Sequence, residues 1–276
     1  MADAAKLAAA LLLDSSSARL EVQYLLQHVL GKPRAWLLAH AETILNPEQL
    51  ADYGARLQQR LRGEPIAYIL GEREFYGLKF KVTPATLIPR PETELLVEQA
   101  LQRIPQERPC QVLDLGAGSG AIALSIAHER PKSGVVAVDA SLAALEVAQE
   151  NAARLGIRNA NFLHGDWYAS LGGRRFDLIV SNPPYVAKND PHLQQGDLRF
   201  EPASALASGT DGLDDIRRIV DGAGSHLEPG GWLLLEHGYD QAVRVRELLE
   251  RAGFAEVFSV RDLGDIERVS GGRRAI

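Results

Sequence analysis

The first seventy residues carry the spacing of amphipathic helices. Between residues 18 and 30, apolar side chains recur every three or four positions, which is the period of one helix face. Asn46 and Pro47 are the residue types of an N-cap and of a first helical turn. Helices are therefore expected near the amino terminus and over residues 18–30, 34–40 and 46–62. We expect residues 1–70 to form a small helical domain.

A hairpin and a stiff linker are predicted next. Residues 78–82 alternate apolar and charged side chains, and Gly77 separates them from an aromatic pair, Phe75 and Tyr76, a pattern typical of paired strands. Three prolines between residues 84 and 91 restrict the backbone that follows. We expect a β-hairpin linker over residues 71–90, followed by a helix that ends near Ile104.

The remaining chain, residues 91–276, alternates short apolar segments with helical ones. Strands are predicted where Val, Leu and Ile gather, at residues 111–116, 134–140, 160–166, 176–184 and 231–238. Helical spacing separates them at residues 121–129, 141–155, 213–227 and 241–252. Such alternation predicts an α/β fold in which helices wrap a parallel sheet. Residues 255–260 and 267–269 are expected to add a hairpin at the sheet edge.

Composition and charge narrow the classes of function. The 276 residues are 46% hydrophobic and 24% charged, as in soluble globular enzymes, and no apolar run reaches the ~20 residues that span a bilayer. Residues 1–80 carry 9 basic and 9 acidic side chains, and residues 81–276 carry 21 and 27. Neither part has the basic balance of a nucleic-acid-binding protein.

The numbers and positions of the cysteine and histidine residues argue against an intrachain disulfide and a metal site. The single cysteine, Cys110, cannot form an intrachain disulfide. The seven histidines are scattered, without the spacing of metal ligands. We therefore expect a cytoplasmic protein with no metal, no membrane association and no direct nucleic-acid partner.

A glycine-rich loop follows the first predicted strand of the sheet. It reads Asp114-Leu115-Gly116-Ala117-Gly118-Ser119-Gly120 and opens a predicted helix, where glycines let the backbone approach a ligand closely. A dinucleotide-binding loop is one alternative, but it needs a glycine where Ala121 stands. The form D-x-G-x-G-x-G resembles the first motif of class I methyltransferases. A loop of that kind holds the methionyl part of S-adenosylmethionine.

Two other strand ends offer groups for the same cofactor. Asp139 ends the second strand, where a carboxylate can accept both ribose hydroxyls, although NAD sites share this feature. Asp166 and Trp167 end the third strand. The carboxylate can accept from the adenine amino group, and the indole can cover the adenine ring. The alternative is a strand-end cap with a buried tryptophan.

The sequence Asn182-Pro183-Pro184-Tyr185 ends the fourth predicted strand, where ligands bind in open α/β sheets. An amide or exocyclic amino nitrogen is a poor nucleophile, and its two hydrogens need two acceptors as it gains positive charge. The Asn182 side-chain oxygen and the Pro183 carbonyl are candidates. The prolines fix φ, and Tyr185 can stack on a planar group. The motif predicts methylation of a planar NH₂ group, without separating glutamine from a nucleic-acid base.

Other segments resemble one family of such enzymes over essentially the whole chain. They are residues 85–94, 195–202 and 235–238, with Leu206 and Asp211-Gly212-Leu213, beside the glycine loop and the Asn-Pro-Pro-Tyr motif. Together they are similar to the bacterial release-factor glutamine methyltransferases. The resemblance implies a helical substrate-recognition domain, a hairpin linker and a class I methyltransferase domain with a mostly parallel seven-stranded sheet.

The resemblance also implies an activity and the residues for it. It implies methylation of N5 of the glutamine in the Gly-Gly-Gln motif of class 1 peptide-chain release factors, with conversion of S-adenosyl-L-methionine to S-adenosyl-L-homocysteine. The implied cofactor contacts are Gly116, Ala117, Gly118, Ser119, Gly120, Asp139, Trp167 and Asn182, to which the strand-end argument adds Asp166. The implied substrate contacts are Asn182, Pro183, Pro184 and Tyr185.

Several alternatives stay open at this point. A glutamine of a ribosomal protein is a second substrate class, an amino group of adenine or guanine in nucleic acid is a third, and a non-catalytic cofactor-binding module is a fourth. Arg90 and Glu92 form either an ion pair between linker and catalytic domain or part of the cofactor pocket wall, with Leu87 and Ile88 as apolar lining. Residues 194–201 either close over the substrate or form a solvated loop.

Overall fold

A computed structural model describes residues 2–11 and 13–275, and they form two compact units. One unit comprises Met1–Glu72 together with Gln194–Phe200. The other comprises Arg73–Leu193 and Glu201–Ile276. We call them the helical unit and the sheet unit. The segment Gln194–Phe200, which the sequence analysis assigned to the catalytic part of the chain, therefore packs as part of the helical unit.

The helical unit contains the helices that the apolar spacing predicts. They are α1 (Ala2–Leu11), α2 (Ser15–Leu30), α3 (Arg34–Ala39), α4 (Pro47–Leu61) and the short α5 (Ile66–Leu70), which the sequence analysis did not predict. Two local hydrogen bonds set the start of α4. Asn46 Oδ1 accepts from Gln49 N at 2.8 Å, and Gln49 Oε1 accepts from Asn46 N at 3.1 Å. This reciprocal capping box satisfies two backbone donors at the helix start.

Arg60 is a buried cation in the helical unit, at only 4% exposure. Its Nε and Nη2 donate to the two carboxylate oxygens of Glu21 at 2.8 and 2.9 Å. Its Nη1 donates to Asp197 Oδ1 at 3.1 Å and to the carbonyls of Gly63 and Glu64. The guanidinium fork thus joins α2, α4 and the segment Gln194–Phe200. A buried charge with this many partners holds its neighbours in one arrangement.

The predicted hairpin is confirmed as a two-stranded sheet of β1 (Glu72–Phe75) and β2 (Leu78–Lys81). Tyr76 and Gly77 at its turn both have positive φ, 51° and 73°. Two consecutive residues of this kind match the twist of paired strands.

The sheet unit contains a seven-stranded sheet with the strand order β5-β4-β3-β6-β7-β9-β8. The strands are β3 (Gln111–Leu115), β4 (Gly134–Asp139), β5 (Ala160–His164), β6 (Phe176–Ser181), β7 (Leu227–Glu236), β8 (Phe254–Arg261) and β9 (Glu267–Arg274). Strands β3 to β7 run parallel, and β9 runs antiparallel to both β7 and β8. The mostly parallel α/β sheet and its edge hairpin are therefore confirmed.

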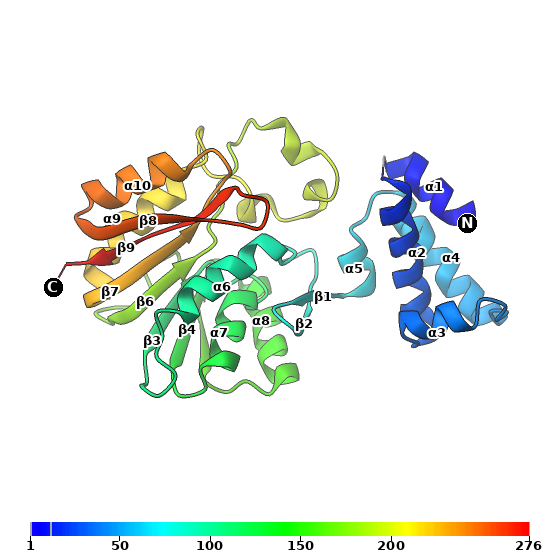
Figure 1. The fold of residues 1–276 in the computed structure, drawn as a ribbon, viewed down its shortest axis with the longest axis horizontal. Helices are drawn as coiled ribbons and strands as arrows, with labels where there is room; N and C mark the ends of the chain where they lie inside the picture. Colours follow the sequence, from blue (N-terminus) through cyan, green and yellow to red (C-terminus); the bar gives the residue numbers. More distant parts are fainter. Residues whose placement is uncertain (1, 12, 276) are drawn as a thin grey trace. The chain divides into compact units, whose positions relative to one another are not determined.

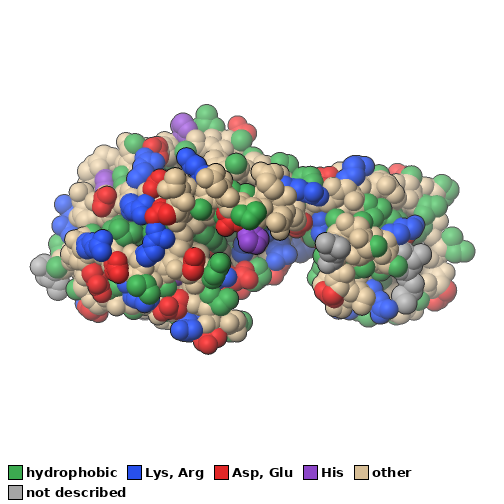
Figure 2. Space-filling view, turned by 90° about the horizontal axis from the view of Figure 1, so that it is seen from above, with side chains coloured by type: hydrophobic (Ala, Val, Ile, Leu, Met, Phe, Trp, Pro, Cys, Tyr) green, Lys and Arg blue, Asp and Glu red, His purple; other side chains and the backbone are tan. Residues whose placement is uncertain are grey.

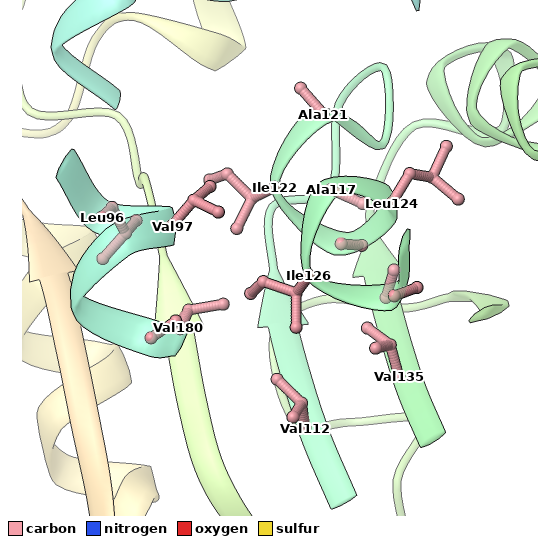
Figure 3. Close-up of a cluster of buried hydrophobic side chains, with 14 of the residues drawn as sticks. Leu96, Val97, Val112, Ala117, Ala121, Ile122, Leu124, Ile126, Val135 and Val180 are labelled. Atoms are coloured by element: carbon pink, nitrogen blue, oxygen red, sulfur yellow. The ribbon is translucent and has the colours of Figure 1, made fainter. Parts of the chain in front are cut away.

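Helices cover both faces of this sheet, as Figure 1 shows. They are α6 (Glu94–Leu101), α7 (Ala121–Glu129), α8 (Leu142–Leu155), α9 (Asp214–His226) and α10 (Ala242–Arg251). Side chains of α6 and α7 pack on strand residues such as Val112, Val135 and Val180 in one core (Figure 3). Helices α9 and α10 pack in a second core on the other face. The sheet is thus buried on both sides, which explains its near-continuous apolar strands.

Short 3₁₀ turns occur in the segments between these elements. They are η1 (Pro91–Thr93), η2 (Pro191–Gln194), η3 (Leu198–Phe200) and η4 (Ala203–Ala205). No helix among residues 2–11 and 13–275 is long and apolar enough to cross a membrane.

We predict that Arg60→Ala destabilises the helical unit by about 3 kcal/mol, because it leaves the Glu21 carboxylate without its partner at a site with little water. Amide hydrogen exchange followed by mass spectrometry should show faster exchange in α4 and in Gln194–Phe200. Lys6→Ala is the control, since Lys6 pairs with Asp3 on the surface and such pairs contribute little. Equal exchange in Arg60→Ala and wild type would contradict the role given to Arg60.

Candidate active site

The glycine loop is tied to the carboxyl end of the neighbouring strand β4. Gly116 N and Ala117 N both donate to the Val138 carbonyl, at 2.9 and 3.0 Å. At Gly120, whose φ is 81°, a Cβ would lie 3.0 Å from Leu124 and 3.2 Å from Ala148. A larger residue there would clash with the packing of α7 against α8. The loop sequence therefore serves both close backbone approach and helix packing.

Asp114 anchors this loop from inside the core. Its Oδ2 accepts from Ala123 N in the first turn of α7 at 3.1 Å, while its Oδ1 has no hydrogen-bond partner among the described residues. Burial raises the pKa of Asp114 to about 7, and the nearby charge of Asp139 acts in the same direction. The carboxyl group thus links β3 to α7 behind the loop.

A cavity of about 530 Å³ opens in front of the loop, within the usual size range of small-molecule sites. Its lining residues come from the carboxyl ends of β3 to β6, from the linker, from α8 and α9, and from residues 202–205: Pro84, Ala85, Thr86, Leu87, Gly116, Gly118, Val138, Asp139, Ala140, Ser141, Ala143, Ala144, Gly165, Asp166, Trp167, Asn182, Pro184, Pro202, Ser204, Ala205, Asp215 and Arg218. The structure therefore brings most of the sequence-predicted site residues together. Ala117, Ser119 and Gly120 lie on the buried side of the loop, outside the lining, and Pro183 and Tyr185 also lie outside it.

Asp139 lies at the cavity wall with both carboxylate oxygens engaged by the backbone. Gly118 N donates to Oδ2 at 2.7 Å, and Ser141 N donates to Oδ1 at 2.8 Å. Each carboxylate oxygen can accept a second hydrogen bond. Asp139 therefore shapes the glycine loop and keeps acceptor capacity for a ligand hydroxyl.

Asp166 and Trp167 line the cavity at the end of β5. Arg218 Nη2 donates to Asp166 Oδ2 at 2.6 Å, a partner that the sequence analysis did not identify. Trp167 has a positive φ of 50°, and its ring atoms lie 3.6 and 3.9 Å from where a Cβ of Gly116 would stand. The indole is thus held against the glycine loop, which is why a side chain at position 116 would crowd it.

Asn182 is fixed at the cavity edge through its side-chain nitrogen. Asn182 Nδ2 donates to Thr93 Oγ1 at 3.1 Å. The strand that carries it is held by Ser181 Oγ, which donates to the Leu115 carbonyl at 2.6 Å. No described residue donates a hydrogen bond to Asn182 Oδ1. The amide oxygen of Asn182 is therefore the atom left to accept from a ligand.

Tyr185 is held at both its main chain and its side chain. Its hydroxyl donates to Glu236 Oε1 at 3.2 Å, and its carbonyl accepts from Gln241 Nε2 at 2.9 Å. Burial raises the pKa of Tyr185, and the charge of Glu236 raises it further. Burial also raises the pKa of Glu236 to about 7, against the effect of the hydroxyls of Thr93 and Tyr185. Tyr185 is thus a proton donor in this contact rather than a base.

Arg90 forms its ion pair with Glu201. The Arg90–Glu92 pair that the sequence analysis offered as one alternative is therefore wrong. Glu201 has a fully buried side chain that accepts from the Arg90 guanidinium and from Ile88 N, the latter at 3.0 Å. Both groups belong to the sheet unit. Of the expected apolar lining, Leu87 faces the cavity, whereas Ile88 is buried outside the lining. The pair fixes the segment around Leu87 beside the cavity.

Residues 194–201 are more than a solvated loop, since Asp197 pairs with Arg60 and Glu201 pairs with Arg90.

Four residues of the site were missed by sequence reasoning: Thr93, Glu201, Arg218 and Glu236. Thr93, Glu201 and Glu236 do lie in segments that resemble the family, but nothing local to them indicates which partners they have.

Among residues 2–11 and 13–275, no group of three or more His, Cys, Asp or Glu side chains could hold a metal ion. Acidic and basic side chains are interspersed over the face of the sheet unit that Figure 2 shows, without one broad basic patch there.

Two family models match this chain. Residues 91–209 match the model of the methyltransferase small domain, and residues 3–71 match that of the PrmC N-terminal domain. A release factor glutamine methyltransferase of Burkholderia pseudomallei is 55% identical over 274 residues, covering 96% of this chain and 95% of its own. The protein of that name from Escherichia coli is 51% identical, covering 94% and 93%.

A solved structure shows the same fold with its cofactor. The Thermus thermophilus 16S rRNA N2 G1207 methyltransferase, solved in complex with AdoMet and guanosine, has a TM-score of 0.56 and 26% identity, and covers 74% of this chain and 49% of its own. The sheet unit therefore has the class I methyltransferase fold. Because relatives above half identity align over almost the whole chain, this protein belongs to the release factor glutamine methyltransferase family.

Proposed function

We propose that this protein transfers a methyl group from S-adenosyl-L-methionine to the side-chain amide N5 of the glutamine in the Gly-Gly-Gln motif of class 1 peptide-chain release factors. One observation carries the proposal: Asn182 lies at the cavity edge with Nδ2 bound to Thr93 and Oδ1 left as an acceptor. An amide NH₂ needs such an acceptor beside the methyl donor. Family membership supports the choice of glutamine.

The chemistry follows from two acceptors and a rigid strand end. The glutamine NH₂ donates one hydrogen to Asn182 Oδ1 and the other to the Pro183 carbonyl. Both hydrogen bonds strengthen as the nitrogen gains positive charge, so they favour the transition state over the ground state. The ring of Pro183 fixes its φ and reduces movement of the carbonyl. Pro184 and Tyr185 provide the surface against which the flat amide lies.

The cavity residues fit the cofactor, which supplies an electrophilic methyl group on a sulfonium and leaves as S-adenosyl-L-homocysteine. In the proposal, the backbone of Gly116 and Gly118 faces the methionyl part, and Asp139 accepts from the ribose hydroxyls through its remaining lone pairs. Asp166 and Trp167 face the adenine. Arg218 holds the Asp166 carboxylate at the cavity wall.

We predict that Asn182→Ala lowers turnover by about 5- to 150-fold, equivalent to about 1–3 kcal/mol for the loss of one acceptor at a buried site. Cofactor affinity should remain close to that of wild type, because the glycine loop and Asp139 are untouched. Steady-state rates with purified release factor measure the first effect, and calorimetry measures the second. Asn189→Ala, at an exposed position, is the matched control. Wild-type turnover in Asn182→Ala would refute the assigned role.

We predict that Asp139→Ala weakens cofactor binding by tenfold or more, since the variant loses two charge-assisted backbone hydrogen bonds of about 1.5 kcal/mol or more each. It also loses the ribose acceptor. Calorimetric titration with S-adenosyl-L-homocysteine tests this without requiring turnover. Asp221→Ala removes an exposed carboxylate on α9, outside the cavity lining, and controls for the change in net charge. Equal affinities of Asp139→Ala and wild type would exclude the ribose role.

One labelling experiment distinguishes the substrate classes. We expect radiolabelled methyl groups from S-adenosyl-L-methionine to appear in a class 1 release factor, and a Gly-Gly-Glu variant of that factor to stay unlabelled. Ribosomal protein, DNA and RNA are offered in parallel reactions. Label confined to a ribosomal protein would favour the sister activity on a ribosomal glutamine. Label confined to nucleic acid would establish amino-group methylation of a base instead.

A further inference from the structure

We propose that Glu236 is a positioning residue which acts through Thr93 to keep Asn182 Oδ1 directed at the reacting nitrogen. The inference rests on the proposed function, because it explains how the Asn182 amide is oriented for the reaction that the proposed function assigns. It concerns residues that do not line the cavity. Glu236 ends β7, and Thr93 lies in η1 just before α6, so two distant segments act on one side chain of the Asn-Pro-Pro-Tyr motif.

The contacts form an incomplete chain. Asn182 Nδ2 donates to Thr93 Oγ1 at 3.1 Å, and Tyr185 Oη donates to Glu236 Oε1 at 3.2 Å. Thr93 and Glu236 are buried, at 4% and 1% exposure. Glu236 Oε2 has no hydrogen-bond partner among the described residues. A buried carboxylate oxygen without a donor is costly.

The Thr93 hydroxyl is the donor that completes the chain. Its oxygen already accepts from Asn182, so its hydrogen is free to donate. The hydroxyl lies close enough to Glu236 to lower the pKa of that carboxyl group. Hydrogen bonds of this kind are often long before substrate binds and shorten in the reacting complex. The completed chain of hydrogen bonds runs from the Asn182 NH₂ through the Thr93 hydroxyl to Glu236 Oε2.

The direction of donation decides which amide atom faces the substrate. An ionised carboxylate only accepts, so Thr93 must donate to it and must accept from Asn182. Asn182 therefore turns its nitrogen to Thr93 and its oxygen to the cavity. If Glu236 carries a proton or is replaced by Gln, it can donate to Thr93. Thr93 then donates to Asn182 Oδ1, the amide turns over, and an NH₂ group faces the substrate NH₂.

The charge of Glu236 makes this arrangement sensitive to pH. Burial raises the pKa of Glu236 to about 7, Glu92 acts in the same direction, and Arg268 and the hydroxyls of Thr93 and Tyr185 oppose the rise. As pH falls through that value, the carboxylate is lost and the amide orientation is no longer fixed. We therefore expect turnover to fall on the acid side, with the cofactor affinity changing less.

The test compares Thr93→Val with Thr93→Ser. Valine keeps the shape of Thr93 without a hydroxyl, and serine keeps the hydroxyl with less packing. We expect Thr93→Val to lower kcat about tenfold, the effect of one hydrogen bond of ordinary strength, with unchanged KM and cofactor affinity. Thr93→Ser should keep most of the wild-type kcat. Glu236→Gln should lower kcat and remove the acid limb of the pH–rate profile.

A readout independent of turnover separates this inference from the proposed function. In spectra of the enzyme with S-adenosyl-L-homocysteine, the Asn182 side-chain ¹⁵N–¹H₂ signals should titrate with pH in wild type and should stop titrating in Thr93→Val. Signals that ignore pH in wild type, or equal kcat in Thr93→Val and wild type, would overturn the inference. Equal losses in the valine and serine variants would also overturn it, because packing would then explain both. If the Asn182 signals titrate but no methylated glutamine is found, the proposed function is rejected and the orientation of Asn182 by Thr93 and Glu236 is not.

Discussion

The hydrogen bond from Asn182 Nδ2 to Thr93 Oγ1, at 3.1 Å, is the interaction on which the site depends. An amide side chain has a donor end and an acceptor end of nearly equal size, and packing alone does not distinguish them. Binding the donor end to the protein leaves the acceptor end for the cavity. The same side chain with reversed ends would present hydrogens to the hydrogens of an NH₂ substrate and would oppose the reaction.

The parallel sheet makes this arrangement possible. Strands β3, β4, β6 and β7 end at one edge, which brings together groups that are far apart in sequence. The glycine loop, Asp139, Asn182 and Glu236 each follow or end one of these strands. Two cores bury both faces of the sheet, so the strand ends are supported by close packing. A group at such an edge needs little further ordering when a ligand binds.

Local pattern was sufficient for the elements and for the main site residues. Apolar spacing predicted the helix α2, apolar segments predicted the strands of the sheet, and the N-cap residues Asn46 and Pro47 predicted the start of α4. The loop Asp114–Gly120 and the motif Asn182–Tyr185 are contiguous, so each could be interpreted without knowing its neighbours. The short α5 was missed because five residues of Ile, Ala, Tyr and Leu carry no distinctive period.

The partners of these residues could not be predicted, because they come from tertiary contacts. One of the two alternatives for Arg90 paired it with Glu92, two positions away, whereas its partner is Glu201. Asp197 belongs with Arg60 in the helical unit, although 137 positions separate them. Pairs of this separation leave no spacing signal, and each charged residue has many possible partners. The roles of the individual cofactor-facing and substrate-facing residues stay predictions from the same geometry.

A structure of the enzyme with S-adenosyl-L-homocysteine and a peptide containing Gly-Gly-Gln tests the central claim most directly. We predict that the glutamine amide nitrogen lies about 2.7–3.2 Å from both Asn182 Oδ1 and the Pro183 carbonyl, with Asn182 Nδ2 still bound to Thr93. A glutamine side chain bound away from Asn182, or an Asn182 whose oxygen accepts from Thr93 in that complex, would contradict the account.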